Sequence, residues 1–451
     1  MQRALSLDNS PPASVPLRFM LSAPVFMMLA GLLLLASPQA LLSRWTPQAL
    51  ALTHLLTLGA LAHTMAGAMM QILPVATGIH VLAPRLTASI THVSLSGGTL
   101  LLAAAFLIGT PWLFGTGAAL LVAGLAWLAM AVACGLWRHR AHAAKGAGEI
   151  LAGVRLALLA LLVTIVIGAV LSGHPAASLP APRQYTGLHA AWGLLGWVGL
   201  LVMAMSYQLI PMFQVTELYP RPITRWLTPC VCALLAAKTL AWIAHAPAWV
   251  ELVLVAALAA TYLAYVGVTL HLLCTRKRPE PDTTTLFWFM GISSLALCAV
   301  LWLAQYLTGI DMSVTLGVLF LAGFAWSVIN GMLYKIIPFL TWFHAQRGLP
   351  MALPFIPKVK QVIPDARAQG QFYAQLAALI LLAAASLLPA QAWLTGAAGL
   401  AQAVSAAWLL AYMVGAIRLL HSTRRKVRAA LAPHTAGLSR GSASGPQHPG
   451  S

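Results

Sequence analysis

Long apolar segments follow one another along the chain, and short stretches between them hold most of the polar and charged residues. A helix needs about 20 mostly apolar residues to cross a bilayer. Lipid offers backbone groups no hydrogen-bond partners, so each crossing is expected to be an α-helix. The pattern predicts an all-α, polytopic membrane protein with about twelve transmembrane helices. They lie near 18–38, 47–74, 88–109, 111–137, 150–172, 186–211, 224–245, 247–273, 284–308, 312–340, 371–389 and 392–420.

Composition supports the membrane assignment. Of the 451 residues, 60% are hydrophobic and only 8% are charged, whereas soluble domains have about 45–50% apolar and about 25% charged residues. A soluble enzyme, a disordered protein and a collagen-like rod are therefore excluded. The net charge of +18 does not indicate a nucleic-acid partner, because the basic residues lie in short loops between apolar segments.

The loop charges predict the orientation. Loops that follow even-numbered segments carry most of the lysine and arginine, whereas loops that follow odd-numbered segments carry only Arg44 and Arg183. By the positive-inside rule, both termini are expected to be cytoplasmic. We therefore expect a multi-pass protein of a bacterial-type inner (plasma) membrane. It would have a cytoplasmic segment over 1–17, a membrane domain over 18–420, and a basic and then disordered cytoplasmic tail over 421–451.

The second, sixth and tenth segments share one pattern. Each has a glycine, a small residue eight positions later, and a proline seven positions after that, with a polar residue three positions before the proline. The positions are Gly59, Gly67, Gln71 and Pro74; Gly196, Ala204, Gln208 and Pro211; and Gly323, Gly331, Lys335 and Pro338. The recurrence every four segments predicts three four-helix pseudo-repeats. The alternative interpretation of the small residues is helix packing alone.

His54, His63, His92 and His189 lie within predicted segments, whereas His245 and His271 lie at segment ends. Imidazole ligates haem iron, copper or zinc without adding negative charge. His54 lies 20 residues before Pro74 and His189 lies 22 before Pro211, so both are expected at nearly equal depth in the outer part of the bilayer. At about 100° per residue, His189 lies on the glycine face of its helix and His54 roughly 140° from it. Helices arranged around a pseudo-threefold axis meet through different faces, so a cofactor shared by these two residues is possible.

His63 and His92 form a second candidate pair. His63 lies on the glycine face of the second segment, and His92 lies about two turns into the third. Copper or another haem is the ligand that this pair would hold. For all four histidines, a hydrogen bond to a neighbouring helix is the alternative.

Other ionisable residues are scarce in the apolar segments. Glu251 and Asp311 lie near outer helix ends, so a carboxylate-based ion pathway is poorly supported. Lys238 is expected either to pair with Glu251 or to extend to the membrane surface. No C-x-x-C-H motif occurs, which argues against a covalently attached haem.

The histidine-bearing segments resemble those of known haem proteins. The stretch from His189 to Pro211, with HAAWGLLGWV and SYQLIP, resembles the haem-ligating helix of haem-copper oxidase subunit I, especially of C-type cytochrome c oxidases. HLLTLG at His54 resembles the NnrS family of haem- and copper-containing membrane proteins. The architecture covers nearly the whole chain, whereas the motif covers only the second, sixth and tenth segments.

The resemblance implies twelve helices in three four-helix arcs, with haem in the outer half of the membrane. It places His189 at an axial haem ligand position and His54 at the neighbouring low-spin ligand position. The chain also departs from the family pattern. Leu316 and Val318 stand where the tenth segment would carry histidines, and the seventh, TPCVCALLAAKTLAW, lacks the adjacent histidine pair that holds copper in the oxidases. A complete oxygen-reducing centre is therefore doubtful.

Three functions follow from these observations. The leading hypothesis is a protein that binds b-type haem, with copper possible, and serves respiratory electron transfer or the handling or sensing of oxygen or nitric oxide. An electron donor or a partner subunit would then be required. The second hypothesis is a cofactor-free transporter or metal-ion permease that uses the intramembrane histidines. The third is a complete terminal oxidase.

Overall fold

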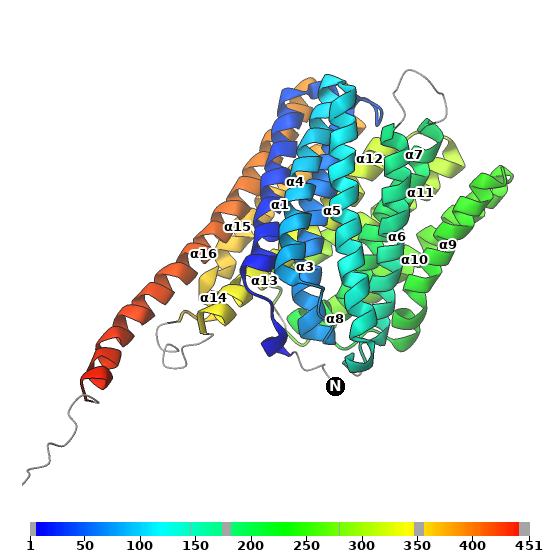
Figure 1. Cartoon of the computed structure of the whole chain (residues 1–451). Coiled ribbons are helices and arrows are strands. Elements are labelled where there is room, and N and C mark those ends of the chain that lie inside the picture. The colour runs from blue at the N-terminus through cyan, green and yellow to red at the C-terminus, as the bar shows by residue number, and fades with distance from the viewer. Residues whose placement is uncertain (1–5, 145, 174–181, 279, 347–355, 442–451) are drawn as a thin grey trace, which may run out of the picture.

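The chain is a bundle of long helices (Figure 1). The computed structural model describes residues 6–144, 146–173, 182–278, 280–346 and 356–441, and in these ranges all regular secondary structure is helical. Twelve helices are long and apolar enough to cross a membrane, and each coincides with one predicted segment. The all-α, polytopic fold predicted from the sequence is therefore confirmed.

The twelve helices form three units of four. In each unit the second helix, which we call the inner helix, is built from several consecutive segments. The first unit has α1 (Ser14–Ala36), the inner helix α2 (Pro47–His54), η3 (Leu55–Ala62), α3 (His63–Ile72) and η4 (Leu73–Thr77), then α4 (Pro84–Ile108) and α5 (Pro111–Arg138). The second has α6 (Gly148–Gly173), the inner helix α7 (Pro182–Ala190), η6 (Ala191–Gly199) and α8 (Leu200–Gln214), then α9 (Arg221–Ile243) and α10 (Ala248–Cys274). The third has α11 (Thr283–Thr308), the inner helix α12 (Ser313–Val318), η7 (Leu319–Trp326) and α13 (Ser327–Gln346), then α15 (Asp365–Leu387) and α16 (Ala392–Gly441).

Short elements lie outside the long helices. They are η1 (Leu7–Asn9), η2 (Pro38–Leu41), η5 (Arg140–His142) and α14 (Val359–Val362). α16 continues as a helix to Gly441, so it includes part of the tail expected over 421–451. The segment RRKVRAALA, which starts at Arg424, is rich in residues of high helix propensity and extends the membrane helix without a break. Residues 442–451 of the expected tail lie outside the described residues.

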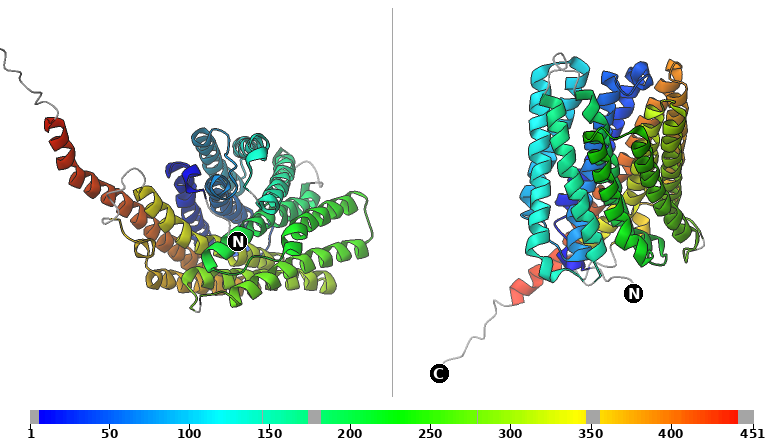
Figure 2. Two further views of the ribbon diagram at one scale, coloured as in Figure 1. Left: turned by 90° about the horizontal axis from the view of Figure 1, so that it is seen from below. Right: turned by 90° about the vertical axis from the view of Figure 1, so that its right-hand side faces the viewer.

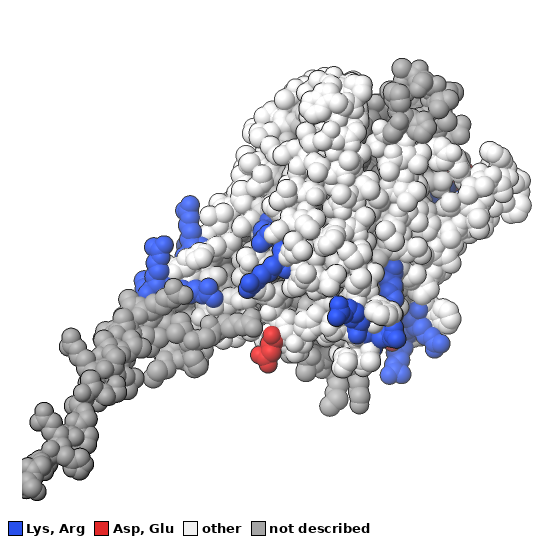
Figure 3. All heavy atoms as spheres, in the orientation of Figure 1, with Lys and Arg blue, Asp and Glu red and all other residues white. Residues whose placement is uncertain are grey.

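The three units close into a ring. The last helix of each unit packs on the first helix of the next: α5 on α6, α10 on α11, and α16 on α1. Seen from below in Figure 2, the blue α1 lies next to α16, whose colour runs from orange to red toward its far end. Lysine and arginine gather at the end of the bundle that also holds the N-terminus (Figure 3), and we call it the basic end.

Each inner helix contains a π-helical segment at the same place. The segments η3, η6 and η7 end at Ala62, Gly199 and Trp326, which in each case is twelve residues before the shared proline, Pro74, Pro211 or Pro338. A π-helix is rare and commonly occurs near functional sites. The predicted pseudo-repeat is therefore present in the backbone as well as in the sequence.

The shared glycine brings each inner helix against the first helix of its own unit. A Cβ added to Gly59 would lie 2.5 Å from the Phe26 ring of α1, and one added to Gly323 would lie 2.8 Å from Ser294 of α11. At Gly196 the same atom would lie 2.7 Å from Ala160 of α6. The interpretation of these residues as packing positions is thus correct.

A polar network joins the second and third units at the basic end. Asp282 caps α11 by accepting a hydrogen bond from the Thr285 backbone N–H at 3.0 Å, and its other oxygen lies 2.5 Å from Nζ of Lys335, the polar residue of the third repeat. Thr285 donates to Gln214 of α8. Burial raises the pKa of the Asp282 carboxyl, but the Lys335 ammonium and the hydrogen bonds from Thr285 outweigh burial, so the pKa lies below its ordinary value.

We predict that Gly323→Ala lowers the unfolding temperature of the detergent-solubilised protein. The added methyl group must displace Ser294, and overpacking of this kind costs about 1–3 kcal/mol. Gly415→Ala is the control, because its Cβ would have no neighbour within 4 Å. If both variants unfold at the same temperature as the original chain, the close approach at Gly323 does not matter for stability.

We also predict that Asp282→Asn destabilises the protein at neutral pH by about 1 kcal/mol, because Asn can still cap α11 but leaves the Lys335 ammonium without its carboxylate. Because the folded-state pKa is lowered, the charge of Asp282 stabilises the fold above the unfolded pKa of about 4, and this contribution is lost as pH falls through the folded pKa. Unfolding temperatures measured from pH 7 downward should therefore converge in acid. A constant difference across this range would contradict the assignment.

Candidate functional site

The structure brings His54 and His189 together. Their ring centroids lie 6.4 Å apart, and the ring planes differ by 25°. His54 is the last residue of α2 and His189 lies near the end of α7, so both imidazoles precede a π-helical segment. The two histidines were expected at nearly equal depth on two inner helices, and the closeness of their rings is consistent with that expectation.

His54 is held in a defined orientation. Its Nδ1–H donates to the backbone carbonyl of Leu50 at 2.8 Å, since a carbonyl can only accept. This bond leaves Nε2 as the unprotonated nitrogen, which is the form that binds a metal. The Phe106 ring of α4 stacks on the imidazole, with centroids 5.2 Å apart. The side chain is therefore ready to ligate without rearrangement of its own helix.

His189 lies in a space created by a glycine. A Cβ added to Gly168 of α6 would lie 3.0 Å from the Cε1 atom of His189. The Nδ1 atom of His189 is buried and makes no hydrogen bond of ordinary geometry, although the Thr164 backbone lies near the ring. A buried, unsatisfied imidazole nitrogen is costly unless a ligand completes it.

Both histidines line one large cavity. Its volume is about 780 Å³, within the range of about 300–1,000 Å³ typical of cofactor sites. Most of the described lining is apolar or aromatic, and the charged residues in it are Arg44, Lys238 and Glu251. Leu316, at a position where histidine would be expected from the family motif, lines the same cavity, so the third inner helix contributes no imidazole.

The spacing of the two imidazoles is compatible with one shared metal ion. A metal–imidazole bond is about 2.0 Å long, so two nitrogens that share one ion lie about 4 Å apart. Ring centroids separated by 6.4 Å are compatible with that spacing. In the described part of the chain no group of three or more His, Cys, Asp or Glu side chains could hold a metal ion. The described part of the site therefore offers two imidazoles as donors.

His63 and His92 also lie together, with ring centroids 5.5 Å apart. Their nitrogens, however, have hydrogen-bond partners. His63 bonds through Nδ1 to the Leu58 carbonyl and through Nε2 to Ser96 Oγ, both at 2.9 Å, and His92 Nε2 lies 2.8 Å from Ser22 Oγ. These contacts account for three of the four ring nitrogens without a metal. A copper site at this pair stays a prediction.

The expected pairing of Lys238 with Glu251 is confirmed. Nζ lies 2.5 Å from Oε1, and the Lys238 side chain is only 12% exposed, so it does not extend to the surface. Tyr306 of α11 donates to the same carboxylate oxygen at 3.0 Å. The cluster ties together α9, α10 and α11 in the wall of the large cavity.

Three contributors to the site were not found from the sequence. Gly168, Phe106 and Tyr306 all come from segments that looked like ordinary membrane helices. No spacing rule relates them to the histidines, because they lie in α6, α4 and α11. Only their places in the folded bundle show their roles.

We predict that Lys238→Met destabilises the protein by leaving the Glu251 carboxylate without its cation. Because Glu251 is 49% exposed, the loss should be about 1 kcal/mol, less than for a fully buried pair. The double variant Lys238→Met with Glu251→Gln should recover most of the unfolding temperature. A double variant no more stable than Lys238→Met would show that the ion pair is not the reason.

Comparison with known proteins does not assign a family to this chain. No protein-family model matches the sequence. None of the curated proteins is significantly similar to it. The likeness of the His54 and His189 segments to haem-ligating helices therefore stays a resemblance.

Proposed function

We propose that this protein binds a b-type haem between His54 and His189 and uses it in respiratory electron transfer or in handling oxygen or nitric oxide. The observation that carries the proposal is the pairing of two imidazoles 6.4 Å apart in a cavity of about 780 Å³. Bound haem would supply one-electron redox chemistry or a gas-binding iron.

The residues around the site have separate tasks in this proposal. The Leu50 carbonyl fixes the tautomer of His54, and Phe106 covers one face of its ring. Gly168 leaves the room that the His189 ring occupies. The mostly apolar lining lowers the local dielectric constant, which strengthens the electrostatic effect of the few charged groups in the wall.

The number of ligating histidines separates the two uses of the haem. With both His54 and His189 on one iron, no ligand position stays open, which favours electron transfer. With one of them held away from the iron, a position is available to a small gas. Binding of carbon monoxide to the reduced protein distinguishes these cases.

In the proposed membrane orientation the basic end faces the cytoplasm of a bacterial-type inner membrane. The lysine and arginine residues at that end support this orientation through the positive-inside rule. His54 and His189 then lie in the outer half of the bilayer.

Transport of a metal ion through the bundle has weaker support. Glu251 is the one carboxylate in the described lining of the cavity, and Lys238 and Tyr306 already bind it. A cation would thus meet no free negative charge there. A transporter would nevertheless be the better account of a protein that purifies without haem.

The proposal predicts a b-type signal in the reduced-minus-oxidised optical spectrum of the purified protein. His54→Ala and His189→Ala should each lower the haem content more than tenfold, since loss of even a supporting residue costs about 10–100-fold in affinity. His271→Ala is the control, because it removes an exposed imidazole in the last turn of α10 that lines neither cavity and belongs to neither candidate pair. A haem content that stays the same in both site variants, or a preparation without haem and iron, would contradict the proposal.

A further inference from the structure

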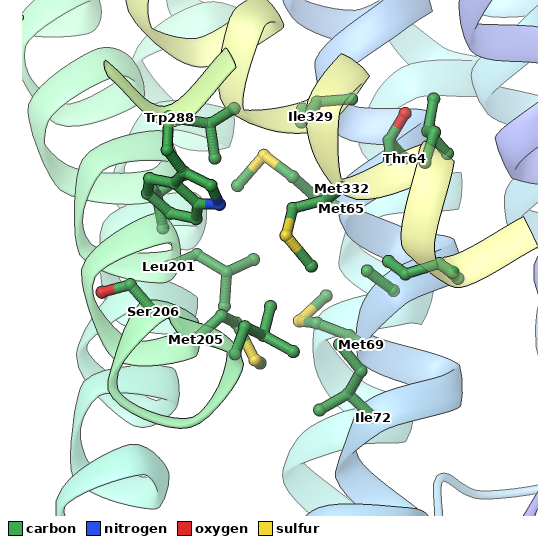
Figure 4. A pocket seen from close by; sticks show the side chains of 16 residues that line it. Thr64, Met65, Met69, Ile72, Leu201, Met205, Ser206, Trp288, Ile329 and Met332 are labelled. Atoms are coloured by element: carbon green, nitrogen blue, oxygen red, sulfur yellow. The ribbon is translucent and has the colours of Figure 1, made fainter. Parts of the chain in front are cut away.

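A second cavity lies where the three inner helices meet (Figure 4). Its volume is about 70 Å³, and we call it the axis cavity. Each inner helix contributes the residues 10, 9, 6, 5 and 2 positions before its shared proline, and Trp288 of α11 completes the lining. The residues are Thr64, Met65, Ala68, Met69 and Ile72; Leu201, Val202, Met205, Ser206 and Leu209; and Val328, Ile329, Met332, Leu333 and Ile336.

The surface of the axis cavity is almost entirely apolar. Four of the chain's methionines line it, and their thioethers are soft and polarizable. The two hydroxyl groups in the lining are turned away from the cavity in Figure 4. They donate instead to carbonyls of their own helices, Thr64 to Ala60 at 3.1 Å and Ser206 to Met203 at 2.7 Å.

One polar atom faces the cavity. The indole of Trp288 is 1% exposed, and its Nε1–H has no hydrogen-bond partner among the described residues. Figure 4 shows the nitrogen edge of this ring directed into the cavity. A buried water needs two to four polar partners, whereas this cavity offers one. The cavity is therefore expected to be dry.

Its size and chemistry select a small neutral molecule. A volume of about 70 Å³ exceeds the roughly 30 Å³ that one water occupies in the liquid. An ion would lose its hydration and find no counter-charge, whereas a neutral gas molecule loses almost no solvation. The lone N–H of Trp288 adds a weak donor for a gas that carries an acceptor atom.

The axis cavity lies next to the large histidine cavity. Along the first inner helix, Ala62 lines the histidine cavity and Thr64 lines the axis cavity, so only about 3 Å of helix rise separates the two linings. Along the second, Val198 and Leu201 are in the same relation, one helical turn apart. The two linings therefore lie close together along these helices.

We propose that the axis cavity is a binding site for a small apolar gas, of the class of oxygen or nitric oxide, beside the histidine cavity. The identity of the gas rests on the proposed haem function. The affinity of the cavity for an apolar atom of similar size does not rest on that function. The proposal of a gas site and the proposal of a haem site can therefore fail separately.

Xenon is the probe, and crystals of the full-length protein under xenon pressure give its position and occupancy. We expect one xenon in the axis cavity of the unmodified chain. Ala68→Met should lower the xenon occupancy at least about tenfold, because the new side chain would extend into the void. Met205 and Met332, at the equivalent positions of the other two inner helices, already line the cavity in this way. Met332→Ala should keep or raise the occupancy by enlarging the void.

Met27→Ala is the matched control, because Met27 is a buried methionine of α1 that does not line the axis cavity. Xenon at the axis should be unchanged in this variant. Ordered water in the axis cavity, or an axis cavity without xenon in the unmodified chain, would overturn the proposal. Xenon occupancy that stays the same after Ala68→Met would overturn it as well. Xenon binding in a preparation without haem would support the cavity while the haem proposal failed.

Discussion

The close approach of each inner helix to the first helix of its own unit is the contact on which the rest of the structure depends. One glycine in each inner helix makes it possible, since any side chain there would overlap the partner helix. This contact sets how the inner helix is rotated. With the glycine face against α1, α6 or α11, another face is left to meet the other inner helices, where the axis cavity lies.

The features that repeat in all three units and the features that differ between them come from different residues. The glycines, the π-helical segments and the five axis positions recur in all three units. The imidazoles do not, since the first and second inner helices carry His54 and His189 whereas Leu316 occupies the wall of the same cavity on the third. A nearly symmetric scaffold thus encloses a cavity in which only the first and second inner helices place imidazoles.

The sequence was sufficient to predict the helices and the repeat, because both depend on local patterns. Apolar length determined the spans, and the spacing of Gly59, Gly196 and Gly323 from their prolines identified the three inner helices. The ion pair of Lys238 and Glu251 was one of two arrangements expected for Lys238, since a short turn joins their helices. The contact of His54 with His189 was only one of the alternatives that the sequence left open, because it depends on how two helices far apart in the chain pack together. Contacts such as Gly168 with His189 depend on which helices become neighbours, and that information is not local.

The separation of packing positions from ligand positions has an evolutionary consequence. A mutation at His54 or His189 changes the donor atoms in the cavity while the glycine contacts that hold the bundle together stay intact. Descendants of one ancestral bundle could therefore gain, lose or exchange cofactors while keeping their shape. In proteins built this way, shape should diverge more slowly than chemistry, and shared architecture alone is a poor guide to the reaction that each performs.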